Sequence, residues 1–274
     1  MQRLIQRISS TYRHGTRRIR ARSRGIYSYL DEQILIQKYI KELKIEKRFC
    51  VDIAAGDGVT MSNTYFLYRE GWEGLAVEYG AQNFAKLVKT YRDFQGVNLA
   101  RCKVTPLNVV SLLKGNELPK NFGVLNLDID GYDYFVLEQI LSEFRPALIC
   151  AEINENIPPP VKFTVKWDPH YAWREDHFYG QSLSQLCSLC PGFRYSLVEL
   201  HYNNAFLVPS EINPGPSLTP EEAFQKGYVN QPDRKEMFPW NNDLEPLLSL
   251  RPEEAEAFVN RFFFDRKGEF ICSL

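Results

Sequence analysis

Residues 51–58, Val-Asp-Ile-Ala-Ala-Gly-Asp-Gly, carry the strongest chemical signal in the sequence. They predict a strand that runs into a glycine turn, where Gly56 and Gly58 let a ligand approach the backbone closely. Asp52 places an acid inside this strand. Glu78 ends the next apolar run, about twenty residues after Gly58. A carboxylate at that second position can accept hydrogen bonds from both hydroxyls of a ribose. The spacing therefore favours a nucleoside site over the alternative, a tight strand-to-helix turn without a ligand.

The glycine turn differs from that of dinucleotide-binding proteins, because Met61 stands where their third glycine is expected. An acid inside the first strand suits a ligand with an ammonium group better than a pyrophosphate. S-adenosylmethionine combines an ammonium, a ribose and an adenine without phosphate, so we expect it across this turn. Its amino-acid end would lie near Asp52 and Gly56, its ribose on Glu78, and its adenine near residues 105–108. The expected cofactor-binding residues are Asp52, Ala54, Gly56, Gly58, Glu78, Thr105, Asn108 and Asp128.

A second group of polar residues is expected beside the first. Asn126, Asp128 and Asp130 alternate with apolar residues, so they share one face of a strand, since strand side chains repeat every two residues. Glu152 ends the next apolar run. Ligands of open α/β sheets bind at the carboxyl ends of the strands, so these acids should border the same crevice as the glycine turn.

Three roles compete for these acids. As a general base, Asp130 is the first choice, followed by His170 and His177 in the loop beyond. As a metal site, Asp128, Asp130 and Glu152 could hold Mg²⁺ or Mn²⁺, although a divalent metal is not the favoured cofactor. A structural role is the third possibility, in which Asp130 and Asp133 cap the following helix and Glu152 meets a basic partner.

Two other functions remain open. Asp128-x-Asp130 is the pattern with which many nucleotide-sugar transferases hold a metal diphosphate, so a metal-dependent sugar transferase is the first alternative. A non-catalytic Rossmann-like binding module is the second.

The elements that position these residues alternate between strand and helix. Short apolar runs predict strands, and the segments between them have helical spacing, which indicates a mainly parallel sheet with helices on both faces. Two closing runs around Tyr202–Asn204 predict a terminal hairpin. The predicted strands are 49–54, 74–79, 97–104, 122–130, 147–154, 195–201 and 205–209, and the predicted helices are 27–44, 63–69, 81–94, 109–114, 132–144, a helix capped by Ser182 and Gln185, one begun by Thr219, and 252–264.

Two stretches resemble the FkbM-type S-adenosylmethionine-dependent methyltransferases. They are Asp52–Glu78, with Ser-Asn-Thr-Tyr at 62–65 and Gly-Trp-x-Gly at 71–74, and Asp128–Asp133. The resemblance spans about residues 48–208. It implies a class I methyltransferase Rossmann-like fold, α/β, with a seven-stranded sheet ending in an antiparallel hairpin. It also implies O-methylation of a hydroxyl on a sugar-containing or small natural-product acceptor.

Charge divides the chain unevenly. Eight of the 33 basic residues lie in residues 1–24, which contain no acid; the remainder holds 25 basic and 34 acidic residues, a net charge of −9. We expect a basic arm at 1–26, a methyltransferase domain at 27–209 and a helical appendix at 210–274. The arm is expected to fold against the acidic body, with a transit peptide or a weak contact with anionic membranes as alternatives. The expected partner is a small-molecule or glycan acceptor, not nucleic acid.

The aromatic residues and the cysteines allow two further predictions. Residues 163–179 hold six aromatics, which predicts either a lid over the acceptor or a loop packed on its own side chains. Six scattered cysteines favour reduced thiols and a cytoplasmic location. Cys187-x-x-Cys190 suggests zinc or redox chemistry as one alternative. No second pair has ligand spacing, and Leu186 and Leu189 form an apolar helix face, so both cysteines are expected to be core residues.

Overall fold

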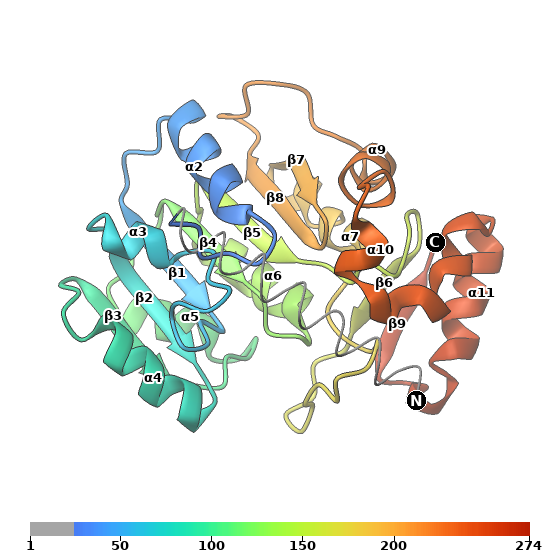
Figure 1. Cartoon of the computed structure of the whole chain (residues 1–274), viewed down its shortest axis with the longest axis horizontal. Helices are drawn as coiled ribbons and strands as arrows, with labels where there is room; N and C mark the ends of the chain where they lie inside the picture. The colour runs from blue at the N-terminus through green and yellow to red at the C-terminus, as the bar shows by residue number, and fades with distance from the viewer. Residues whose placement is uncertain (1–24) are drawn as a thin grey trace.

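The computed structural model describes residues 25–274. A seven-stranded sheet forms its centre, with the order β3-β2-β1-β4-β5-β8-β7 (Figure 1). Strands β1 to β5 are parallel to one another, whereas β8 is antiparallel to both β5 and β7. This is the strand order of the class I methyltransferase fold, so the predicted fold is confirmed. The strands are β1 (Phe49–Ile53), β2 (Glu73–Glu78), β3 (Val97–Arg101), β4 (Val124–Leu127), β5 (Leu148–Glu152), β7 (Tyr195–His201) and β8 (Asn204–Pro209).

Helices cover both faces of this sheet, as predicted. One face is covered by α2 (Glu32–Glu42), α3 (Tyr65–Arg69) and α4 (Ala81–Tyr91), whose buried residues share a core with the sheet. The other face is covered by α5 (Val109–Gly115), α6 (Asp133–Glu143), α7 (Leu183–Cys187) and α9 (Pro220–Phe224). Both faces of the strands are therefore apolar, as expected for parallel strands buried between helices.

Two element boundaries differ from prediction at functionally relevant places. The lead-in helix begins at Glu32 and not at residue 27, because Asp31 has a left-handed backbone with φ 69°. Strand β4 ends at Leu127, so Asp128 and Asp130 lie in the turn that follows it and not on a continuing strand face.

Beyond the hairpin, residues 210–274 do not form a purely helical appendix. Besides α9, this segment contains η1 (Gln225–Val229), α10 (Arg234–Met237), η2 (Pro239–Asp243), η3 (Glu245–Ser249), α11 (Pro252–Phe262), η4 (Phe264–Arg266) and the strand β9 (Phe270–Ser273). A further short helix, α8 (Cys190–Phe193), lies before the hairpin. β9 pairs antiparallel with β6 (Lys162–Val165), a strand inside the aromatic loop, and neither strand was predicted. The predicted helices at 219 and 252 are confirmed, the first with a complete capping box between Thr219 and Glu222.

The basic arm lies almost wholly outside the described residues. The expectations for residues 1–24 therefore remain predictions. In the described chain, no helix combines the length and the apolar character needed to span a bilayer.

Candidate active site

The carboxyl edge of the sheet brings the predicted site residues together. Ile53 pairs with Val77 on one side and with Leu127 on the other, and Leu127 pairs with Ala151. Four adjacent strands, β2, β1, β4 and β5, therefore end at the same level of the sheet. The residues at this level are Ala54, Glu78, Asp128 and Glu152.

The glycine turn follows β1 and is held by Glu78. Ala54, Gly56 and Gly58 all have positive φ, at 69°, 60° and 81°. A Cβ on Gly58 would lie 2.6 Å from the Leu87 side chain, so this position needs glycine for space as well as for backbone angle. The Gly56 N–H donates to Glu78 Oε2 at 3.0 Å, and the Gly80 N–H donates to Oε1. A carboxylate is thus fixed, partly exposed, at the side of the turn.

Asp52 lies beneath this turn and not in its open part. It is 2% exposed, and each carboxylate oxygen already has a donor: the Thr64 hydroxyl at 2.6 Å and the Asn126 amide at 2.8 Å. Asn63 in turn donates to Asn126 Oδ1 at 3.0 Å. Burial raises the pKa of Asp52 to about 6. The expected direct contact between Asp52 and a bound ammonium group is therefore corrected, because this carboxylate joins β1 to α3 and β4.

Three carboxylates form a cluster on the other side of the turn. Asp128, Asp130 and Glu152 are partly exposed, and one oxygen of each lies within 4.8 Å of the others. Asp128 and Glu152 share a hydrogen bond, and the Asn203 amide donates to Glu152 Oε1 at 2.8 Å. Burial raises the pKa of Asp128, and burial together with the charges of Asp128 and Asp130 raises that of Glu152 well above its usual value. Burial and mutual repulsion therefore favour the protonated forms of these carboxyl groups.

Asp130 is the member of the cluster best suited to exchange a proton. Its backbone is left-handed, with φ 53°, and its carbonyl oxygen accepts a hydrogen bond from the Tyr171 hydroxyl at 2.9 Å. Burial, reinforced by the charges of Asp128 and Asp133, raises its pKa to about 8. A carboxylate with a pKa near neutrality can accept a proton and release it again during turnover.

Among residues 25–274, no side chain caps the start of α6, so the helix-capping role that competed for Asp130 is not observed, and Asp133 instead stabilises the turn before the helix. Its two oxygens accept from the N–H groups of Ile129 and Gly131 at 2.8 and 2.9 Å. These bonds fold the turn that carries Asp130, so Asp133 positions the candidate base.

The two candidate histidines are placed differently. His177 interacts with Asp243 in η2, at 3.1 Å, and therefore faces the C-terminal segment. His170 is exposed; its neighbour Tyr171 reaches Asp130, and Lys103 binds the carbonyl oxygen of Tyr171 at 2.9 Å. The structure thus brings the loop around His170 to the edge and assigns His177 to a different contact.

The chain that leaves β3 runs beside the end of β2, where Glu78 lies. The Cys102 N–H donates to the Glu78 carbonyl oxygen at 3.2 Å. Asn108 is occupied within this turn, because it accepts from the Thr105 N–H at 2.8 Å and donates to the Lys103 carbonyl oxygen at 2.9 Å. Asn108 therefore shapes the turn, and Thr105 remains the expected cofactor neighbour.

Three residues of the site were not among the predicted ones: Thr64, Asn203 and Tyr171. Thr64 belongs to the Ser-Asn-Thr-Tyr motif, which signalled the family resemblance but not a bond to Asp52. Asn203 lies in the predicted hairpin turn, and its position follows from the antiparallel return of that hairpin to the same edge. Tyr171 had no sequence signal beyond its loop.

No protein-family model and no curated protein matches the sequence. Among solved structures, the N-terminal domain of EvdMO1, crystallised in the presence of SAH and D-fucose, is 11% identical, with 65% of this chain and 82% of that chain covered and a TM-score of 0.43. A putative O-methyltransferase from Klebsiella pneumoniae is 14% identical, with 64% and 77% covered and a TM-score of 0.43. An S-adenosylmethionine-dependent methyltransferase from Clostridium acetobutylicum is 10% identical, with 72% and 98% covered and a TM-score of 0.42. Because these scores are low, the fold assignment rests on the strand order.

Proposed function

We propose that the protein is an S-adenosylmethionine-dependent O-methyltransferase of the FkbM type, which methylates a hydroxyl of a small-molecule or glycan acceptor. The observation that carries the proposal is the pairing of two features at one sheet edge. Glu78 is fixed beside an open glycine turn, and a cluster of three carboxylates with raised pKa values lies two strands away. The same proposal places the reaction in the cytoplasm.

The residues at the edge fit this cofactor. Ala54 and Gly56 leave the turn accessible, and Glu78 presents a carboxylate from the end of β2, where ribose hydroxyls can donate to it. Thr105 would border the adenine. When bound, the cofactor supplies a methyl group that is already activated by the sulfonium, so the protein need only align the acceptor and remove a proton.

Asp130 would accept that proton from the acceptor hydroxyl. Its pKa of about 8 comes from burial and from neighbouring carboxylates, and Tyr171 fixes the backbone on which it stands. General-base assistance of this kind typically contributes about 10²- to 10⁴-fold to the rate.

A divalent metal at Asp128, Asp130 and Glu152 is the competing use of the same cluster, since three carboxylate oxygens suit Mg²⁺ or Mn²⁺. The general-base proposal predicts that methyl transfer survives exhaustive chelation. If EDTA abolished the activity and Mg²⁺ restored it, metal-assisted catalysis would replace the general-base proposal.

Calorimetric titration with S-adenosylmethionine tests the cofactor assignment. Replacing Glu78 by Ala should weaken binding by about 1.5–3 kcal/mol, because charge-assisted hydrogen bonds to the ribose are lost. The matched control is Glu73→Ala, an exposed glutamate at the other end of β2, which should leave the affinity unchanged. No binding by the wild-type protein, or equal affinity in both variants, would refute the assignment.

A further inference from the structure

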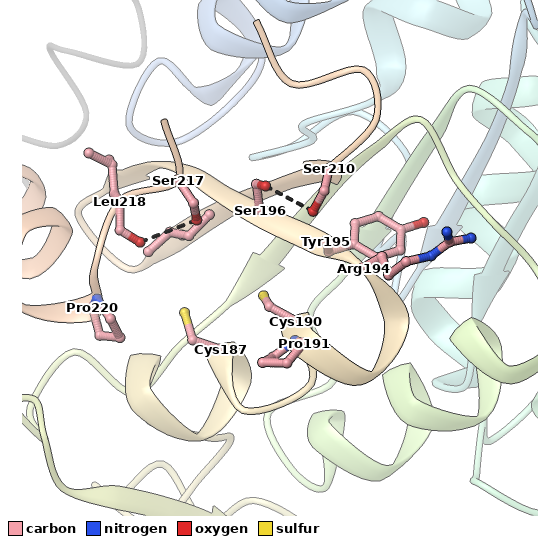
Figure 2. A pocket seen from close by; sticks show the side chains of 11 residues that line it. Cys187, Cys190, Pro191, Arg194, Tyr195, Ser196, Ser210, Ser217, Leu218 and Pro220 are labelled. Atoms are coloured by element: carbon pink, nitrogen blue, oxygen red, sulfur yellow. Dashed lines mark hydrogen bonds between the residues drawn. The ribbon is translucent and has the colours of Figure 1, made fainter. Parts of the chain in front are cut away.

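A pocket that contains two thiols lies away from the carboxyl edge. It has a volume of about 470 Å³ and lies between the junction of α7 and α8, strand β7 and the segment that leads into α9. Its lining includes Cys187, Cys190, Ser196, Leu218 and Pro220. In Figure 2 the sulfur atoms of Cys187 and Cys190 both point into this pocket.

The local backbone explains why the two thiols meet. Cys187 ends α7 and Cys190 begins α8, and the residues between them, Ser188 and Leu189, keep helical angles. Residues three apart on a helix lie on one side, with Cβ atoms about 5–6 Å apart. The expectation of two core cysteines is therefore corrected: both pack partly against the core, but both are half-buried and line a pocket.

The pair also differs chemically from the other four cysteines. Burial raises the pKa values of the thiols of Cys50, Cys102, Cys150 and Cys272. Cys190 alone has a lowered pKa, because its interaction with the neighbouring Cys187 thiol favours the thiolate. The same interaction and burial raise the pKa of Cys187. An accessible thiol with a stabilised thiolate next to a second thiol is the arrangement that reacts with disulfides.

We infer that Cys187 and Cys190 form a redox-active dithiol, which low-molecular-weight disulfides such as oxidised glutathione convert to an intramolecular disulfide. The Cys190 thiolate attacks one sulfur of the reagent, forms a mixed disulfide and releases one glutathione thiolate. Cys187 then loses its proton and attacks Cys190 Sγ, which releases the second glutathione. In sum, two protein thiols are oxidised and one oxidised glutathione is reduced to two molecules of glutathione. The site does not depend on the proposed methyl transfer.

Mass spectrometry of the full chain tests this inference. The reduced protein is incubated with oxidised and reduced glutathione at a series of ratios, quenched with acid, alkylated and digested with trypsin. Residues 175–194 form one tryptic peptide that holds both cysteines and no other. In the wild-type protein, this peptide should lose two hydrogens without gaining glutathione, and dithiothreitol should reverse the change.

Single variants show whether each thiol is needed. In Cys187→Ser the reaction should stop at a stable glutathione adduct on Cys190. In Cys190→Ser the reaction should stop at a glutathione adduct on Cys187, since no second thiol is left to resolve it. The peptide containing Cys272 serves as an internal control and should remain unmodified. A wild-type peptide that stays fully alkylated, or that stops at a glutathione adduct as the single variants do, would overturn the inference.

Discussion

Asp52 and Glu78 lie near the carboxyl ends of neighbouring strands, but their surroundings give them different roles. Asp52 is buried, and both of its oxygens are used by Thr64 and Asn126. Glu78 is partly exposed, and its carboxylate accepts from the N–H of Gly56 in the glycine turn and from that of Gly80 after β2. The first therefore fixes the position of the turn, and the second is free to meet a ligand.

The burial of Asp52 makes stability depend on pH. Its pKa rises from 3.8 to about 6 on folding, so the folded protein binds this proton more tightly. The resulting stabilisation, on the order of 3 kcal/mol, is complete below pH 3.8 and is lost as the pH rises to about 6. In Asp52→Asn, urea denaturation should show a shallower fall in unfolding free energy across this window. The exposed Asp93→Asn is the control, and identical slopes in all three proteins would contradict the account.

Replacing Asp130 tests whether it is the general base. With the cofactor bound, Asp130→Asn should lower kcat by about 10²- to 10⁴-fold and leave cofactor affinity nearly unchanged. Because the base must be deprotonated, the wild-type rate should rise with pH through about 8, and the variant should lack this limb. His177→Asn is the matched control, since His177 pairs with Asp243. A variant at Asp130 with the wild-type pH profile would remove it from the mechanism.

At the scale of elements, the aromatic loop and the C-terminal segment form one unit. Phe163 on β6 packs against Phe178 of the loop and against Phe263 and Phe270 of the C-terminal segment, with ring centroids 5.4–6.0 Å apart. The pairing of β6 with β9 adds backbone hydrogen bonds. The loop was predicted either to cover the acceptor as a lid or to pack on its own side chains. Phe163 and Phe178 follow the second prediction, and they also pack against rings from outside the loop.

This shared core predicts the effect of two phenylalanine replacements. Phe163 is fully buried, so Phe163→Ala should lower the unfolding free energy by about 3–5 kcal/mol. Phe264 is 66% exposed, so Phe264→Ala should change it by less than about 0.5 kcal/mol. Urea denaturation of both variants measures the difference, and equal effects would show that the C-terminal segment does not share the core of the loop.

The sequence predicted the central elements because their signals are local. Alternating runs of strand and helix between residues 49 and 209 come from apolar periodicity and turn residues, and each was found within a few positions. β6 and β9 escaped prediction because each is four residues long and stabilised mainly by its distant partner. Asp52 was assigned to the ligand because its bonds to Thr64 and Asn126 depend on how α3 returns over the sheet, which no local pattern records.

At the scale of the molecule, the site depends on the topology of the sheet. Strand order places the ends of β1, β2, β4 and β5 side by side, and the β7–β8 hairpin returns Asn203 to the same edge (Figure 1). The C-terminal segment contributes from outside the sheet by holding the loop that carries Tyr171. Residues of the glycine turn, the carboxylate cluster and the hairpin thus reach one edge from distant parts of the chain.

The central claim is that this edge moves a methyl group from S-adenosylmethionine to an acceptor hydroxyl. Its most direct test is mass spectrometry of a cell extract incubated with the protein and cofactor labelled in the methyl group. The account predicts a small molecule or glycan that gains one labelled methyl with the wild-type protein and not with Glu78→Ala or Asp130→Asn. An extract without any labelled acceptor at saturating cofactor, or labelling that both variants retain, would contradict it.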